Sequence, residues 1–294
     1  MVLEIIKHKK IYFSISIFLI LGSLFSLILF GLKLGIDFTG GSLIEVKFIE
    51  ERLSTDQIKE NIADLDLGQV NLQPTGEKGL ILRLKDIDEK THQEILGKIG
   101  LVEEGRFESI GPVIGEELKR NALWAIGLAL IAIIIYIAWA FRKVSQPVAS
   151  WQYGLVAIIA LFHDVFITLG FFSFFGYLKG IEVGLPLVAA FLTILGYSVN
   201  NSIVIFDRVR ENLLKTDWKE FSQTINQSIN QSISRCFNTA LTTLFVLLAI
   251  FLLGGETIKY FSLALIIGII VGTYSSIFIT SPLIVLWQGK KLKK

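Results

Sequence analysis

The chain has 294 residues, 52% of them hydrophobic, and its mean hydropathy is +0.62. These values exclude an ordinary soluble domain, because the apolar residues come in long runs. The 28 basic and 26 acidic residues nearly cancel, so net charge does not indicate a nucleic-acid partner. Cys236 is the only cysteine, which excludes an internal disulfide.

Several apolar runs are long enough to cross a bilayer, which takes about 20 residues in a helix. We predict six spans, at residues 11–33, 121–141, 152–176, 185–206, 237–253 and 260–287. The first run is longer than the apolar region of a cleavable signal peptide, and no convincing cleavage site follows it. The sequence therefore predicts a multi-pass α-helical membrane protein.

Basic residues predict how the spans are oriented, because they collect on the cytoplasmic side. With six crossings, all four basic clusters fall on the same side; they are Lys7–Lys10, Arg142 with Lys143, the stretch from Arg208 to Arg235, and Lys290–Lys294. We therefore expect both termini to be cytoplasmic. Residues 1–33 then form the N-terminus and first span, and residues 121–294 hold the other five spans.

Residues 34–120 would form one domain on the opposite side of the membrane. Residues 42–49 alternate apolar and polar side chains, as a half-buried strand does. The remaining predicted elements are a helix at 55–65, strands at 69–73 and 79–85, a helix at 88–99 and a strand at 101–110. This βαββαβ order predicts a small ferredoxin-like α+β domain. No metal-ligand cluster is visible in it, and we expect no cofactor.

Glycine-rich connections join this domain to the spans on both sides. Asp37 precedes Gly40 and Gly41 on the way in, and Gly111 precedes Pro112 on the way out. Glycine pairs commonly mark turns, so a fixed neck is one interpretation. A hinge that lets the domain move as a rigid body is the other.

Polar residues within the spans are candidates for a functional site. Asp164 lies near the middle of the third span, next to His163, where a carboxylate is costly unless protonated, paired or hydrated. It predicts either a proton or cation relay or a structural hydrogen bond between helices. Asn200 and Asn201 in the fourth span are candidates for the same polar site or for helix packing.

Charged residues mark the cytoplasmic ends of the fourth and fifth spans. Asp207 and Arg208 would be solvated there. Arg235 stays protonated at physiological pH, so it can hold a carboxylate nearby or extend its charge to the membrane surface. Between these spans, apolar residues recur every three or four positions over residues 211–235, which predicts an amphipathic helix on the inner membrane surface.

No constellation for an enzyme is present: we find no phosphate loop, no nucleophile with a matching base and no set of zinc ligands. We therefore predict that the chain is not an enzyme.

Several ordered motifs resemble the SecD/SecF family of protein-export membrane proteins, in the SecF half. They are residues 35–41, 110–113, 163–165, 192–212, 232–235, 251–256 and 272–276. The resemblance implies half of an RND-type transporter of the inner membrane, paired with SecD. It further implies that the pair assists the SecYEG channel and the SecA motor. The pair would use a proton or sodium gradient to promote late translocation of unfolded polypeptide.

One position departs from the family pattern, which usually has Asn-Asp where this chain has Asn200 and Asn201. An asparagine can form hydrogen bonds but cannot titrate. Asp164 or a carboxylate of SecD would then carry the relay, with Arg235 nearby. Two alternatives remain open, namely half of a small-molecule RND exporter and a structural membrane adaptor without ion coupling.

Overall fold

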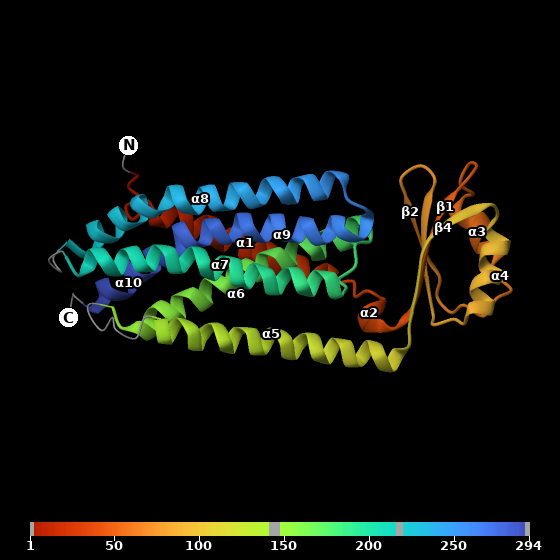
Figure 1. Ribbon diagram of the computed structural model, residues 1–294, viewed down its shortest axis with the longest axis horizontal. Helices are drawn as coiled ribbons and strands as arrows, with labels where there is room; N and C mark the ends of the chain where they lie inside the picture. The colour runs from red at the N-terminus through yellow and green to blue at the C-terminus, as the bar shows by residue number, and fades with distance from the viewer. Residues whose placement is uncertain (1–2, 141–147, 216–219, 292–294) are drawn as a thin grey trace. The chain divides into compact units, whose positions relative to one another are not determined.

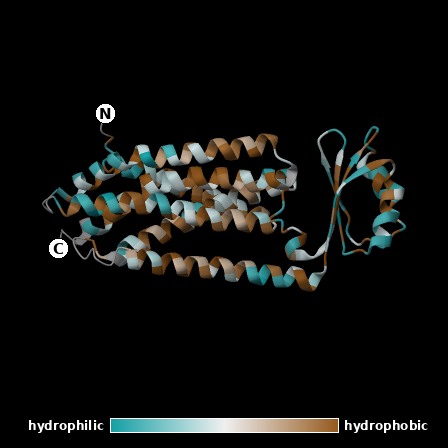
Figure 2. Cartoon of the chain, viewed as in Figure 1, coloured by the Kyte–Doolittle hydropathy of each residue, from teal (hydrophilic) through white to brown (hydrophobic). Residues whose placement is uncertain are grey.

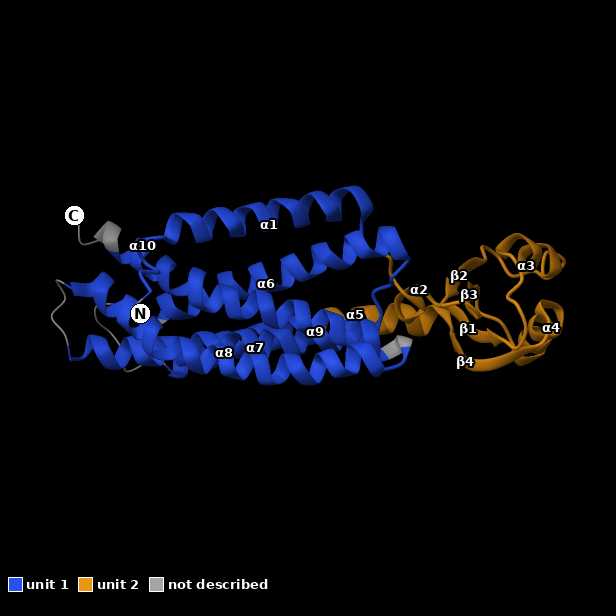
Figure 3. Cartoon of the chain, turned by 90° about the horizontal axis from the view of Figure 1, so that it is seen from above, with its two compact units in different colours: residues 1–32, 125–294 blue, residues 33–124 orange. Residues whose placement is uncertain are grey.

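The computed structural model describes residues 3–140, 148–215 and 220–291 and separates into two compact units. Residues 33–124 form a unit with a β-sheet, which we call the sheet unit (Figure 3). Residues 1–32 and 125–294 form the helical unit. The predicted fold class, six membrane helices with a small α+β domain after the first, is confirmed.

The sheet unit contains four antiparallel strands in the order β2-β3-β1-β4. Its elements in chain order are α2 (Ile36–Thr39), β1 (Gly41–Phe48), α3 (Thr55–Asn61), β2 (Asn71–Thr75), β3 (Gly79–Leu84), α4 (Glu89–Ile99) and β4 (Val102–Ile110) (Figure 1). Strands β1 and β3 lie in the middle of the sheet. The connection from β1 through α3 to β2 therefore passes over β3, and the connection from β3 through α4 to β4 passes over β1. This is the ferredoxin-like arrangement that the element order predicts.

Alternation along the central strands produces the core of the sheet unit. One face of β1 contributes Ile44, Val46 and Phe48, which pack with alternate leucines of β3 and with Ile58 of α3 and Ile95 of α4. The intervening residues of β1 lie on the other face, which carries polar and charged side chains. Strand side chains alternate between the two faces, so each predicted strand buries one side against the helices.

Both connections of the sheet unit meet at a close crossing. Gly40 and Gly41 have φ values of 71° and 125°, and a Cβ on Gly40 would lie 2.8 Å from the Cα of Pro112. A Cβ on Gly115 would in turn lie 2.9 Å from the backbone nitrogen of Gly40. At Gly40 and Gly115 a side chain would collide with the other backbone segment, and at Gly40 and Gly41 the positive φ also favours glycine.

Helix α5 (Pro112–Ala140) starts earlier than the predicted span at residue 121. We predicted residues 111–115 as a connection, but Pro112 is the first residue of the helix. A fixed φ near −65° suits proline to this position, since its missing N–H would have no partner there. The polar residues at 116–120 continue the helix, which hydropathy alone could not show.

The helical unit contains the other long helices. They are α1 (Lys9–Phe30), α6 (Ser150–Lys179), α7 (Leu185–Leu213), α8 (Phe221–Leu253) and α9 (Glu256–Ser275), followed by a π-helical turn η2 (Ser276–Thr280) and α10 (Ser281–Lys291). Within the described ranges, six helical segments are long and apolar enough to cross a membrane, in agreement with the six predicted spans. Figure 2 shows hydrophobic residues along these helices and hydrophilic ones where α7 ends and α8 begins.

Helices α6, α7 and α9 form the inside of the helical unit, whereas the apolar parts of α1, α5 and α8 are largely exposed. Small residues allow the closest approaches: Gly170 of α6 packs on Ser23 of α1, and Gly268 of α9 packs on Ile194. The hydroxyl of Ser26 also donates to the carbonyl of Gly170, at 3.1 Å. Close approach through small residues is the usual means of helix association in membranes.

The segment 211–235 differs from the prediction of a separate helix on the membrane surface. Residues 221–235 are the first half of α8, which continues into the fifth span without a break. Its apolar stripe is buried in the core of the helical unit: Phe221, Ile225 and Ile229 pack with Tyr153 and Phe206. The prediction was wrong because periodicity shows that a stripe needs cover, but not whether lipid or protein provides it.

Two asparagines explain the polar face of this segment. Asn230 accepts a hydrogen bond from the backbone nitrogen of Leu3 at 2.8 Å, and Asn226 donates to the carbonyl of Leu3 at 2.9 Å. Ile5, in the same N-terminal stretch, is buried. The start of the chain is thus bound along the first half of α8.

The glycine crossing predicts a specific stability effect. Gly40→Ala should lower the melting temperature of the full chain in detergent by several degrees, because the new Cβ meets Pro112 at a positive φ. Gly76→Ala is the matched control, since its φ is 54° but nothing lies within 4 Å of the new Cβ. Equal melting temperatures for the two variants would contradict the importance of the crossing.

The cap of α4 predicts a pH effect. Asp88 accepts from the backbone nitrogen of Thr91 at 3.0 Å and from its hydroxyl at 2.6 Å, and these hydrogen bonds hold the Asp88 pKa below its ordinary value. A pKa lowered by folding stabilises the fold above the unfolded-state pKa, and this stabilisation is lost as the pH falls through the folded-state pKa.

Asp88→Asn should therefore retain the cap near neutral pH but weaken the acid dependence of the melting temperature. Asp88→Ala should lower the melting temperature at neutral pH as well. Melting curves of both variants across the acid range test this, and an unchanged acid dependence in Asp88→Asn would refute it.

Candidate functional site: a buried carboxylate in the helical unit

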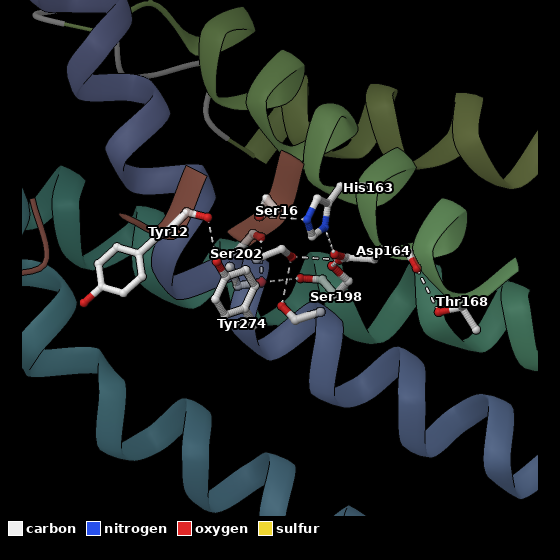
Figure 4. A network of polar contacts seen from close by, with 11 residues as sticks. Tyr12, Ser16, His163, Asp164, Thr168, Ser198, Ser202 and Tyr274 are labelled. Carbon is white, nitrogen blue, oxygen red and sulfur yellow. Dashed lines mark hydrogen bonds and ion pairs between the residues drawn. The ribbon is translucent and has the colours of Figure 1, made fainter. Parts of the chain in front are cut away.

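Asp164 of α6 is completely buried and accepts hydrogen bonds from side chains of three elements (Figure 4). Its Oδ1 lies 2.8 Å from Nδ1 of His163, its neighbour on α6. Its Oδ2 accepts from Ser198 of α7 at 2.5 Å and from Ser275 of α9 at 2.8 Å. Both carboxylate oxygens are thus satisfied, as a buried charge requires.

The polar network continues from this carboxylate to α1. Nε2 of His163 lies 3.0 Å from the hydroxyl of Ser16, and both residues are buried. The hydroxyl of Tyr274 on α9 donates to the backbone carbonyl of Tyr12 at 2.7 Å. On the α7–α9 side, the hydroxyls of Ser202 and Ser276 lie 3.0 Å apart. The network therefore connects α1, α6, α7 and α9 with the turn that follows α9.

The backbone of α9 is shaped to approach Asp164. A Cβ on Gly272 would lie 3.1 Å from the Cβ of Ser198 and 3.4 Å from Oδ2 of Asp164, so a larger residue would push α9 away. The helix then widens into the π-helical turn at Ser276–Thr280, beside the network. Single π-helical turns of this kind are frequent at functional sites.

The arrangement is suited to taking up a proton. When the carboxylate is ionised it only accepts hydrogen bonds, so Nδ1 of His163 carries a hydrogen and Nε2 faces Ser16. Protonation would convert one carboxylate oxygen into a donor and force a serine hydroxyl or the imidazole to reorient. Among the residues that the structure describes, no group of three His, Cys, Asp or Glu side chains could hold a metal ion.

The structure does not bring together the four residues predicted as one polar site. Asp164 lies in the network, whereas Asn201 is buried and approaches the hydroxyl of Thr273 at 3.4 Å. Asn200, its neighbour, is exposed on the other side of α7. Arg235 is exposed on α8, so the predicted proximity of Arg235 and Asp164 is not observed in this chain.

Arg235 instead lines a small pocket of about 110 Å³ between the end of α7 and the first half of α8. Asp207, Arg208 and Glu211 line the same pocket. Arg208 pairs with Glu211 at 2.7 Å, and Asp207 pairs with Arg210 at 2.9 Å. The predicted charged end of α7 is thus a set of ion pairs on one helix.

Sequence reasoning missed most of the partners of Asp164. Ser16 and Ser198 are serines within largely apolar helices, where a serine commonly bonds to its own backbone and indicates no site. Tyr274 and Ser275 belong to a run of small and polar residues, 272–276, of a kind that is typical of helix packing in membranes. The signal in the sequence was that a polar run in the sixth span and a carboxylate in the third span both need polar partners inside the membrane.

In the neck, Asp37 lies in the short helix α2, and Gly40 and Gly41 follow it at the crossing with Pro112. Gly111 immediately precedes α5. The predicted neck residues thus lie together within the sheet unit, apart from the buried carboxylate in sequence and in unit.

Known proteins similar to this chain agree with the resemblance seen in the sequence, and the similarity extends over nearly the whole chain. Residues 91–290 match the family "Protein export membrane protein SecD/SecF, C-terminal", and residues 25–48 match the "SecD/SecF GG Motif". The chain is 39% identical to a protein of Thermobaculum terrenum named protein translocase subunit SecF, with 98% of this chain and 95% of the relative covered. It is 41% identical to the SecF of Sebaldella termitidis, with 98% and 93% covered.

A solved structure shows the same fold. The crystal structure of SecDF from Thermus thermophilus, described as a translocon-associated membrane protein, matches with a TM-score of 0.82 and 32% identity over 97% of this chain. The match covers 38% of the SecDF chain, so the chain described here corresponds to a minor part of that protein. Taken with the six apolar helices, these matches show that the chain is a multi-pass membrane protein and belongs to the SecD/SecF family as a SecF protein translocase subunit.

Proposed function

We propose that this chain couples ion movement across the inner membrane to a late step of protein export, and that protonation of Asp164 is the coupling event. The observation that carries the proposal is the carboxylate itself, fully buried among membrane helices and bonded to three of their side chains. Ionisable residues in this position are rare and costly, and they commonly belong to ion pathways.

A proton at Asp164 would act on the packing of the helices. Adding it removes a buried charge and turns the oxygen that faces His163 into a donor, so the hydrogen bonds that Ser198 and Ser275 donate to the other oxygen lose the strength of bonds to a charged acceptor. These serines lie on α7 and α9, and Gly272 leaves little room between the two helices. Two hydrogen-bond arrangements would thus favour two packings, which is what coupling requires.

The partner that fits the remaining exposed polar groups is a SecD protein. Asn200 of α7 and Asn238 of α8 are exposed in the apolar parts of their helices, and Arg235 is exposed where the polar first half of α8 ends. Amide and guanidinium groups in contact with lipid tails are costly, so we propose that SecD helices cover them. The SecDF structure, in which the matching part is 38% of the chain, supports this pairing.

In the complete assembly, SecYEG and SecA would deliver an unfolded polypeptide to the pair. The basic clusters favour a cytoplasmic location of both termini, with the sheet unit on the outer side. The crossing of Gly40 with Pro112 supports a neck that moves the sheet unit as one block. Either a proton or a sodium gradient could drive such a cycle, but the contacts of Asp164 are side-chain hydrogen bonds from His163, Ser198 and Ser275, which favours the proton.

Removing the titratable group tests the proposal. Asp164→Asn should reduce the gradient-dependent completion of preprotein translocation to the level without a gradient, because an amide cannot change its protonation state. The measurement is translocation into membrane vesicles that contain the chain, its SecD partner and the translocon, with and without an imposed gradient. Ser173→Ala is the control, since its buried hydroxyl bonds only to the carbonyl of Ser26 among the contacts described. Full gradient stimulation in Asp164→Asn would refute coupling through this residue.

Arg235 and Asn201 provide a second comparison. Arg235→Ala should impair export more than Asn201→Ala, because Arg235 belongs to the exposed polar surface that the partner would cover, while Asn201 is buried and contacts Thr273 at 3.4 Å. Arg235→Lys should retain part of the activity, because it keeps the charge but not the planar guanidinium. Export assays at matched protein levels decide this, and small equal effects in both alanine variants would contradict it.

A further inference from the structure

We infer that His163, Ser16 and Tyr274 form a proton path that links Asp164 to the end of the helical unit where α1 begins. The inference rests on the proposed uptake of an ion by Asp164, and it commits that ion to a proton. It assigns a role to two hydroxyl groups, on α1 and α9, that the coupling proposal does not use.

The path consists of side chains in hydrogen-bonding contact. Oδ1 of Asp164 meets Nδ1 of His163 at 2.8 Å, and Nε2 of the same ring meets the hydroxyl of Ser16 at 3.0 Å. The hydroxyls of Ser16 and Tyr274 are interacting neighbours, and the rings of His163 and Tyr274 stack with centroids 6.4 Å apart. An imidazole can accept a proton on one nitrogen while it releases one from the other.

The path leads from the interior toward the surface. Asp164, His163 and Ser16 are buried, whereas Tyr274 is only partly buried. The hydroxyl of Tyr274 bonds to the carbonyl of Tyr12, which lies in the first turn of α1 after Lys9. In Figure 4 the Tyr274 ring lies between Tyr12 and the network around Asp164.

Three other hydroxyl groups of α6 and of the turn after α9 donate to backbone carbonyls. Thr168 donates to the carbonyl of Asp164 at 2.8 Å, Ser276 donates to that of Ser198 at 3.2 Å, and Ser173 donates to that of Ser26 at 2.9 Å. A carbonyl accepts a hydrogen bond but has no proton to pass on. These contacts stabilise the helices, whereas the branch through His163 can transfer a proton.

Each transfer is balanced. Water at the surface gives a proton to the oxygen of Tyr274, whose own hydroxyl proton turns from the Tyr12 carbonyl to Ser16. Ser16 passes its proton to Nε2 of His163, and the proton on Nδ1 moves to Oδ1 of Asp164. Tyr274 and Ser16 are regenerated, His163 stays neutral with its hydrogen now on Nε2, and Asp164 alone has gained a proton.

The test follows the protonation of Asp164 itself. The full chain in lipid vesicles is subjected to a rapid drop in pH, and the infrared band of the protonated carboxyl group is recorded over time. The band is assigned by its absence in Asp164→Asn. Tyr274→Phe, which keeps the ring, and Ser16→Ala should each slow the appearance of the band by at least about tenfold, with the final amplitude unchanged.

Tyr12→Phe is the matched control. It also removes a tyrosine hydroxyl at this end, but the path uses only the backbone carbonyl of Tyr12, and the ring contact with Phe278 at 4.5 Å is preserved. It should behave as the wild type. A wild-type rate in both Tyr274→Phe and Ser16→Ala would overturn the path, as would equal slowing in Tyr12→Phe.

The same variants separate this inference from the proposed function. If Tyr274→Phe slows the band while Asp164→Asn keeps its gradient-driven export, the path stands and the coupling role falls. If Asp164→Asn abolishes gradient-driven export while Tyr274→Phe leaves the rate of the band unchanged, coupling stands and this path is overturned. Absence of the band from the wild type would overturn both.

Discussion

The packing of the helical unit depends on one buried carboxylate. Asp164 is fully buried, and three side chains from α6, α7 and α9 donate to it. A charge in this environment is tolerated only when its hydrogen bonds are complete, so the positions of these helices and the state of the carboxylate depend on each other. Gly272 makes this dependence tight by allowing α9 to approach.

Around this contact, the two halves of the unit use polar residues in different ways. Between α1 and α6, Ser26 and Ser173 bond to backbone carbonyls and hold the helices together. On α7 and α8, Asn200 and Arg235 are exposed. The helical unit is therefore complete at its interior but not at its α7–α8 surface, as expected of a subunit of a larger assembly.

The replacement at Asn201 is consistent with this picture. Its amide is buried against Thr273, a contact that a neutral side chain can make without a counter-charge. The buried carboxylate among the described residues of the helical unit is Asp164, and its supporting histidine is adjacent to it in the sequence. A subunit that lacks a titratable residue at 201 thus retains a fully supported carboxylate elsewhere among the same helices.

The local pattern of apolar and polar residues was sufficient to predict the membrane spans and the strands and helices of the sheet unit. Runs of about 20 apolar residues reflect bilayer thickness, and alternation in β1 reflects the two faces of a strand, so both can be predicted without knowledge of contacts. The glycine pair at Gly40 and Gly41 was visible for the same reason. Even so, the start of α5 at Pro112 was missed, because a helix does not need apolar residues to continue beyond the membrane.

Tertiary structure alone decided the site. Ser16, Ser198 and Ser275 come from positions far apart in the chain, and nothing local distinguishes them from serines such as Ser26 that bond to a carbonyl. The sequence determined that a costly carboxylate lies within a span, but its partners depend on how α1, α7 and α9 pack around α6. The same packing covers the stripe of α8 with protein and leaves Arg235 exposed, because burial belongs to the assembled helices and not to any one of them.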